Sequence, residues 1–519
     1  MTRAPTAITG SDTLRVWAGF AAMCVGMFIA ILDVQIVATS LPNIQAALQI
    51  RPDQMSWIQT AYLIAEVVAI PLTGLLMRIL SMRWLFVGAT VIFTLASVGC
   101  AASGSFAALI GWRVVQGAAG GTLIPVVFSA VFLMFPLSRQ GLATTLAGVL
   151  AVLAPTVGPI VGGWITQTWS WHWLFLINVL PGLLAAMVGV WVLPRIRASF
   201  GLLWSADFLG IALLALCLAA LEIGLKQAPQ RGWASGLVIG LMVLAGISGA
   251  GFVRRSLGHR TPVVDLRAFR DRNFALGCVF SFVLGIGLFG SVYLMPVFLA
   301  FVRGQNALQI GTVMLVTGLC QLLAAPVAVA LERRLQARWL TAAGFSLFAV
   351  GLGMSAFQTP QTDFADMVWP QVARGLAIMF CLLPPTRLAL GHLKSDKVPD
   401  ASGFFNLMRN LGGAIGLAMI DTAIYSRTAG HATDLTARLV AGDVSAARFI
   451  GIPEALLGMA PLTPSAQLQL APLLQKAALT LAINDAWAMI AALTALALIC
   501  LPFVRINAPI HTQPGFLRH

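Results

Sequence analysis

The sequence predicts an all-α membrane protein with about fourteen transmembrane helices. Of its 519 residues, 59% are hydrophobic and only 10% are charged, which is too little charge to cover a soluble protein of this length. Apolar stretches of about 20 residues, the length that a helix needs to cross a bilayer, recur along almost the whole chain. Helices are expected because lipid offers no partners to free backbone N–H and C=O groups.

The predicted spans follow one another with mostly short connections. They cover residues 17–40, 55–77, 84–103, 107–134, 141–166, 172–193, 206–225, 234–253, 273–300, 307–331, 339–357, 366–391, 402–427 and 478–504. The first stretch is too long for the core of a signal peptide, so we expect it to be retained as a helix. Segment 428–477 shows helical periodicity, which predicts a small ordered cap on the periplasmic side.

The positive charges are distributed unevenly along the chain. Most of the 32 Lys and Arg residues lie in segments that face the cytoplasm if the N-terminus is inside. This positive-inside bias predicts that both end segments, 1–16 and 505–519, are cytoplasmic. It also explains the net charge of +14 without nucleic-acid binding. The basic, partly amphipathic segment 254–272 is expected to lie along the cytoplasmic membrane surface, near anionic lipid.

Metal binding and enzyme activity are not predicted. All seven cysteines fall in apolar spans, without CxxC or metal-ligand spacing, so we expect neither a metal site nor a disulfide framework. No HExxH or GxSxG motif is present, and no cofactor is expected.

A weak internal repeat predicts two similar halves. RVVQGAAGG (113–121) in the fourth span resembles QVARGLAIM (371–379) in the twelfth, and GPIVGG (158–163) resembles GGAIG (412–416). Transporters are commonly built from such repeats, with the substrate site between them. The expected division is an N-terminal six-helix bundle, two inserted helices with the basic linker, and a C-terminal six-helix bundle, at residues 17–193, 194–272 and 273–504.

Asp33 and Arg113 are charges within predicted spans, where an ionisable group costs about 2.5 kcal/mol or more. At 1.5 Å per residue, Asp33 lies roughly 12 Å and Arg113 roughly 9 Å from the outer surface, so the two can meet. A neighbouring Arg favours the ionised carboxylate, and its departure favours the protonated form. The pair therefore predicts a proton-loading site, with a static structural ion pair as the alternative.

Four other charged residues within the predicted spans are candidates for a function. Glu66, near the midplane, could bind a proton, attract a cationic substrate or make a structural hydrogen bond. Arg374 and Asp421 lie at similar depths and could form a second pair, unless Asp421 is solvated at the membrane interface. Arg409, near the inner side, could hold an anionic substrate group or snorkel to the cytoplasm.

Taken together, these motifs resemble the major facilitator superfamily and, within it, the fourteen-span drug:proton antiporters of the EmrB/QacA type. LDVQIVATSLPNI (32–44) is similar to the first-helix motif and places Asp33 at its acidic position. The fourth-helix and fifth-helix motifs are matched at Arg113, Gln116, Gly117, Gly158, Pro159, Gly162 and Gly163. Further similar runs are SWHWLFLINVLPG (170–182), PVVDLRAFRDRNFALG (262–277) and WPQVARG (369–375). Arg78 departs from the family pattern, which usually has an acidic residue there.

The resemblance implies a bacterial inner-membrane exporter of small amphipathic or hydrophobic molecules that works by alternating access, with protons as the coupling ion. It also implies a periplasmic membrane-fusion adaptor and an outer-membrane channel, with 428–477 as the natural docking surface. Candidate substrate-binding residues are the polar or aromatic groups Gln35, Gln59, Tyr62, Glu66, Tyr293 and Asn406. Export of one endogenous metabolite or siderophore and, less favoured, uptake symport are the alternatives.

Overall fold

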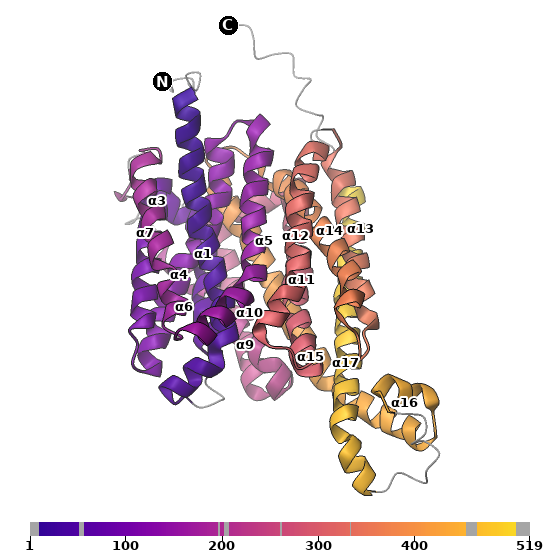
Figure 1. Cartoon of the computed structure of the whole chain (residues 1–519). Helices are drawn as coiled ribbons and strands as arrows, with labels where there is room; N and C mark the ends of the chain where they lie inside the picture. The colour runs from indigo at the N-terminus through magenta and orange to yellow at the C-terminus, as the bar shows by residue number, and fades with distance from the viewer. Residues whose placement is uncertain are drawn as a thin grey trace.

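All regular secondary structure in the described part of the chain is helical. The structure is a computed structural model that describes residues 10–50, 55, 57–195, 198–201, 207–259, 262–332, 334–452 and 464–504. Most of the long helices run along a common direction and form two groups side by side (Figure 1). The all-α fold class predicted from composition is confirmed.

The first group contains the N-terminal helices. Its members are α1 (Gly10–Leu48), α3 (Trp57–Ala101), α4 (Phe106–Met134), α5 (Leu137–Thr168), α6 (Trp173–Leu176) and α7 (Val179–Val192). Helix α3 is broken at Ser81, whose φ of 72° is non-helical, so it has two arms. These arms correspond to the predicted spans 55–77 and 84–103.

The second group contains the C-terminal helices, and two inserted helices precede it. The inserted helices are α9 (Phe208–Arg231) and α10 (Gly236–Gly258), followed by the short turn η1 (Leu266–Arg270). The second group comprises α11 (Arg272–Val297), η2 (Phe298–Val302), α12 (Ala307–Glu332), α13 (Ala337–Met354), η3 (Ser355–Phe357), α14 (Phe364–Leu390), α15 (Val398–Val440), α16 (Val444–Ile450), α17 (Pro464–Leu496) and η5 (Ala497–Phe503).

Twelve helices in the described residues are long and apolar enough to cross a membrane. One of the twelve is the whole of α3, which covers two predicted spans. The twelve do not include α15, which contains the predicted span 402–427 and carries several polar and charged residues. Fourteen spans result only if α3 is counted as two spans and α15 is added to the twelve helices. The number fourteen therefore stays a prediction.

Separate apolar cores hold the two groups together. In the N-terminal group, Phe86, Phe93 and Phe128 are fully buried in one core, and in the C-terminal group Phe345 and Trp487 are fully buried in another. A third cluster, which we call the seam cluster, takes residues from both groups and from α9 and α10. Each bundle therefore has a core of its own, and the two bundles also touch directly, because Val149 of α5 belongs to the C-terminal core and the seam cluster joins α3 to α11, α14 and α15.

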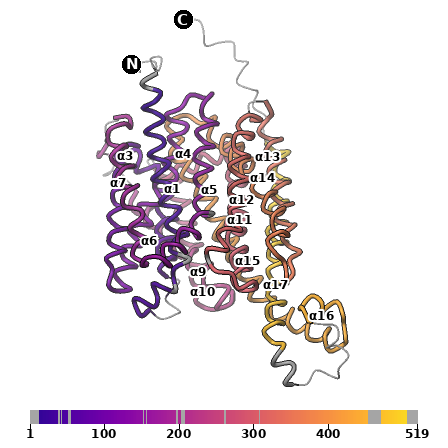
Figure 2. The backbone as a smooth tube through the Cα atoms, viewed as in Figure 1, coloured from indigo at the N-terminus to yellow at the C-terminus, as the bar shows by residue number. Residues whose placement is uncertain are grey.

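The ends of the molecule are distinguished by where the chain begins and where α16 lies. Helix α1 begins and η5 ends at the same end of the bundle, which we call the inner end (Figure 2). Helix α16 projects from the opposite, outer end. Assignment of the inner end to the cytoplasm is a prediction from the positive-inside bias.

An ordered cap projects from the outer end. Helix α15 has 43 residues and is therefore roughly 65 Å long, about twice the hydrocarbon thickness of a bilayer. Its last turns pack through Leu435 and Leu439 against Ile450 of α16 and Ala478 of α17. The expected cap is confirmed for the described residues. Residues 453–463 of this segment lie outside the described part of the chain. Hydrogen bonds from Ser445 and Arg438 hold the pKa of Asp443, the N-cap of α16, well below its usual range.

Candidate functional site

A buried ion pair joins α1 and α4 inside the N-terminal bundle. Arg113 Nη1 lies 2.5 Å from Asp33 Oδ2, and neither side chain is exposed. Charges removed from water are tolerated where they are paired and hydrogen-bonded. The expectation that these two side chains meet is confirmed, and their use in proton loading stays a prediction.

Two amides complete the hydrogen bonding of the Asp33 carboxylate. Gln116 Nε2 and Asn178 Nδ2 donate to Asp33 Oδ1 at 3.0 and 2.7 Å. Both amides also donate to Ser97 Oγ, at 2.8 and 3.4 Å, and Arg113 Nη1 donates to Gln116 Oε1 at 2.7 Å. Donors on α4 and at the N-cap of α7 therefore hydrogen-bond to a buried carboxylate on α1.

Helix α3 forms the other wall of this site. Arg113 Nε donates to the Ile58 carbonyl at 3.1 Å, and the guanidinium carbon lies 4.4 Å from the centre of the Tyr62 ring. The Tyr62 hydroxyl donates to the Ala30 carbonyl at 3.0 Å, and the side chain is fully buried. Tyr62 therefore packs inside the N-terminal bundle and supports Arg113, and its role in substrate binding stays a prediction.

Glycines in the fourth-helix motif let α4 touch the backbone of α3. A Cβ at Gly117 would lie 2.2 Å from the Tyr62 carbonyl oxygen, and one at Gly121 would lie 2.4 Å from that of Glu66. Real Cβ atoms do not approach backbone so closely, and small residues are the usual means of close packing in membranes. The motif therefore sets the distance between Arg113 and the helix on which it rests.

The fifth-helix motif brings α5 against α1 in the same way. A Cβ at Gly158 would lie 2.4 Å from the Cβ of Gln35, so the part-buried Gln35 faces α5. Pro159 lies inside α5, where it removes a backbone donor. Gly162 and Gly163 are buried as well. The absence of a side chain at Gly158 therefore allows α5 to approach α1 closely.

Glu66 has neighbours that the sequence did not indicate. It is only 8% exposed, and it interacts electrostatically with Glu222 of α9 and with Arg409 of α15. Arg409 is 6% exposed and lies 5.5 Å from the ring of Phe128 on α4. It is buried between the bundles, which does not fit the alternative that it snorkels to the cytoplasm, and its contact with an anionic substrate group stays a prediction.

The predicted pair of Arg374 and Asp421 does not form. Asp421 Oδ1 accepts a hydrogen bond from the Tyr293 hydroxyl at 2.7 Å and interacts electrostatically with Lys226. Arg374 donates to the Pro370 carbonyl at 3.3 Å and lies 4.7 Å from the Trp487 ring. Similar depth was not sufficient, because the two side chains face different neighbours.

The remaining predicted substrate-binding residues differ in their surroundings. Asn406 is fully buried, donates to the Ser402 carbonyl at 2.9 Å and accepts from Arg409 Nη2 at 2.7 Å. It therefore orients Arg409, and its role in substrate binding stays a prediction. Tyr293 is half-buried, and its hydroxyl donates a hydrogen bond to Asp421. Gln59 is a half-buried residue of α3.

At the inner end, ion pairs hold helix ends together. Arg78 of α3 donates to Asp400, at the start of α15, through contacts of 2.5 Å to both carboxylate oxygens. A Cβ at Gly74 would collide with the Asp400 carboxylate, so a glycine makes room for this contact. Arg78 replaces the usual acidic residue of the family and still forms a link between the two bundles, with the acid on the opposite bundle.

Three residues of these networks were missed from the sequence. Asn178 and Glu222 are polar residues inside predicted spans, which is the signal that singled out Glu66. Asp400 lies just before a predicted span, and its pairing with Arg78 depends on contact between bundles, for which the sequence carries no local signal.

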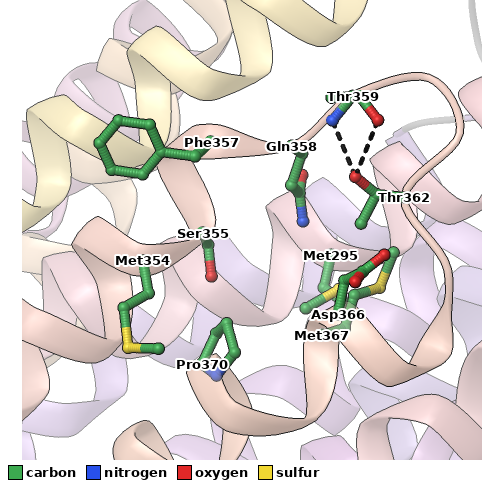
Figure 3. Close-up of a pocket in the computed structure, with 10 residues that line it drawn as sticks. All are labelled: Met295, Met354, Ser355, Phe357, Gln358, Thr359, Thr362, Asp366, Met367 and Pro370. Atoms are coloured by element: carbon green, nitrogen blue, oxygen red, sulfur yellow. Dashed lines mark hydrogen bonds between the residues drawn. The ribbon is translucent and has the colours of Figure 1, made fainter.

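A cavity of about 320 Å³ lies away from these charges, at the outer end of the C-terminal bundle (Figure 3). Ser355, Gln358, Thr362 and Asp366 supply polar atoms to its lining, together with methionines and Phe357. None of the residues predicted for the site lines it. The charged network around Asp33 in the N-terminal bundle and the charges at the seam, and not this cavity, therefore form the candidate functional site.

Two packed helical bundles, a buried ion pair and charged contacts across their seam define a membrane transporter. The chain belongs to the Major Facilitator Superfamily, whose family model matches residues 23–417. The chain is accordingly a multi-pass membrane protein, and the resemblance inferred from its motifs is confirmed.

Named relatives and solved structures agree with this assignment. The chain is 39% identical to the colistin resistance protein EmrB of Acinetobacter baumannii over 81% of this chain and 82% of the relative. It is 30% identical to the multidrug export protein EmrB of Escherichia coli over 80% and 81% of the two chains. The human organic anion transporter MFSD10 has the same fold, with a TM-score of 0.60, 13% identity and coverage of 94% and 99%. The proton:xylose symporter XylE does too, with a TM-score of 0.58, 13% identity and coverage of 95% and 97%.

Proposed function

We propose that the protein exports small amphipathic or hydrophobic compounds across the bacterial inner membrane in exchange for protons. The names of its relatives support export of several compounds. The observation that carries the proposal is the buried pair of Asp33 and Arg113, because a solvent-free carboxylate held by an arginine changes its contacts when it takes a proton.

Protonation of Asp33 removes the negative charge that holds Arg113. The guanidinium keeps its bonds to Gln116 and to the Ile58 carbonyl, so it can shift toward α3 without losing every partner. A proton thus changes the balance of contacts between α1 and α4, which shifts a two-state equilibrium if the two states differ in these contacts.

Helix α3 can carry this change to the seam. Ile58, Tyr62 and Glu66 are spaced by four residues and lie along one face of the helix, with Arg113 against the first two. The same arm continues to Arg78, which binds Asp400 of the other bundle. Alternating access then consists of breaking and remaking the contacts between the bundles as Asp33 loses and gains its proton.

Everted membrane vesicles test proton exchange directly. With an imposed pH gradient, addition of ethidium to vesicles of the wild type should release protons and concentrate the dye inside. Asp33→Asn should abolish both signals, because the amide cannot cycle a proton. Asp396→Asn, which changes an exposed carboxylate in the inner loop, should have no effect.

The direction of the signals separates the alternatives. Proton movement with substrate in the same direction indicates uptake symport, and transport of a single metabolite with no dye movement indicates a dedicated exporter. Proton-driven dye export by Asp33→Asn at the wild-type rate refutes the proposed mechanism.

We also propose that the outer cap docks a periplasmic adaptor, as part of a tripartite pump with an outer-membrane channel. The cap exposes apolar side chains beyond the bilayer, including Val440 (64% exposed) and Val444 (46%). Val440→Asp with Val444→Asp should prevent co-purification with a co-expressed membrane-fusion adaptor of the host, while vesicle transport continues. Thr433→Asp, at another exposed cap position, is the control. Unchanged co-purification of the double variant refutes this surface.

A further inference from the structure

The inserted helix α9 lies along the seam between the two bundles. Its residues Leu214 and Leu218 belong to the seam cluster, together with Ile70 of α3 and Phe405 of α15. Just beyond its outer end, Trp233 Nε1 donates to Thr422 Oγ1 of α15 at 3.0 Å. A helix that served only as a lipid-facing spacer would have no need of these contacts.

The face of α9 toward the seam is charged in its outer half. Leu214, Leu218, Glu222 and Lys226 are spaced by four residues and therefore follow one face of the helix. Lys226 Nζ donates to Thr60 of α3. Glu222 Oε2 is buried and has no hydrogen-bond donor, a situation that costs free energy unless something is bound there.

Five charges connect the bundles through α9. Arg409 interacts with Glu66, Glu66 with Glu222, Glu222 with Lys226, and Lys226 with Asp421. Three are carboxylates and two are cations, so one negative charge remains uncompensated when all are ionised. The nearby Asp33 and Arg113 neutralise each other and do not alter this difference.

The surroundings of the two central acids define what could supply the missing charge. Glu66 of α3 and Glu222 of α9 interact as like charges, and buried like charges repel unless a cation or proton is shared between them. Buried apolar side chains flank both acids: Val67 and Ile70 on α3 and Leu218 on α9. A positive group attached to an apolar body fits such a setting.

We infer that Glu66 and Glu222 form a binding site for the positive group of monovalent amphipathic cations, with α9 contributing directly to substrate recognition. The inference rests on the proposed export function and names a substrate class for it. Glu222 supplies a carboxylate oxygen without a donor, Glu66 supplies the opposing charge from the N-terminal bundle, and the apolar residues of the seam cluster contact the rest of the molecule. Lys226 competes with the substrate for Glu222.

Direct binding to purified protein in nanodiscs tests the site without any proton gradient. Tetraphenylphosphonium carries a permanent single charge, and Nile red is an uncharged apolar probe. Glu222→Gln should weaken tetraphenylphosphonium binding about tenfold and leave Nile red binding unchanged. Lys226→Gln should strengthen tetraphenylphosphonium binding several-fold, an effect that loss of folding cannot produce. Asp396→Asn is the matched control on an exposed carboxylate.

Each outcome decides for or against the site. Equal loss of both probes in Glu222→Gln, with Glu222→Asp failing to restore discrimination, assigns the residue to folding and overturns the inference. Unchanged tetraphenylphosphonium binding combined with a shifted pH profile of Nile red export shows that the acids take a proton only, which also overturns it. If the wild type exports Nile red by proton exchange but does not bind tetraphenylphosphonium, the inference fails and the proposed function stands. If no probe is exported at any pH gradient, the proposed function fails, whatever the binding result.

Discussion

Removal of the Arg78 guanidinium should favour the state in which the inner ends of the bundles separate. Arg78 contacts both oxygens of Asp400 at 2.5 Å, with side-chain exposures of 31% and 10%. A hydrogen bond to a charged group contributes about 1.5–3 kcal/mol, and solvent screening of a partly exposed arginine favours the lower end of that range. About 1.5 kcal/mol corresponds to roughly a tenfold change in the ratio of the two states.

Pulsed electron paramagnetic resonance can measure this ratio. Spin labels introduced by Arg139→Cys and Arg334→Cys, both exposed at the inner end, report the distance between bundles in a variant without the seven native cysteines. In the Arg78→Gln background, the population at long distance should rise about tenfold. Lys394→Gln, which removes an exposed charge at the same end, should leave the distribution unchanged.

Exchange of the two charges provides the sharper comparison. Arg78→Asp alone places two acids together and should open the inner end further, while Arg78→Asp with Asp400→Arg should return the distribution most of the way to that of the wild type. Failure of the double exchange to restore it, or an unchanged distribution in Arg78→Gln, would refute the reasoning that this ion pair holds the bundles together.

Three further predictions follow from the same contacts. Asn178→Leu removes one hydrogen-bond donor to the buried Asp33 carboxylate, so proton-driven dye transport in everted vesicles should fall several-fold; transport at the wild-type rate contradicts this. Gly117→Ala forces a methyl group against the α3 backbone and should lower stability by about 1–3 kcal/mol in thermal unfolding, whereas Gly111→Ala, with open space around it, should not. Glu332→Gln weakens a 3.0 Å ion pair between α12 and α14 and should reduce stability by about 1 kcal/mol or more because Glu332 is nearly buried; no change in melting temperature argues against that contribution.

The fold was predictable because hydropathy and length act locally. A stretch of about 20 apolar residues needs no knowledge of the rest of the chain to be identified as a span. The same method identified α3 as two spans, where the structure has a break at Ser81. Helix α15 shows where local hydropathy is less informative, because its buried Asn406 and Arg409 lower its apolar character while packing between helices.

The Asp33 and Arg113 pair was predictable for a related reason. Depth along a helix follows from residue number. Two opposite charges at the same depth in the hydrocarbon region are stabilised when they pair, because pairing lowers the free energy of keeping each charge there. The same reasoning failed for Arg374 and Asp421, because depth does not determine the direction in which a side chain points. Asp421 instead accepts a hydrogen bond from Tyr293 and interacts electrostatically with Lys226. Arg374 lies against the Trp487 ring.

By itself, the sequence determined the membrane class, the approximate positions of the spans, and the charges that needed an explanation in lipid. These properties depend on transfer of individual segments from water to hydrocarbon, which each segment undergoes whatever its neighbours are. Only the tertiary structure decided which charges are partners, that Tyr62 and Asn406 are internal supports, and that α9 lies on the seam, where Glu222 interacts electrostatically with Glu66. Those outcomes depend on helix rotation and on contacts between residues far apart in the chain, such as Arg78 with Asp400, and no local pattern encodes either.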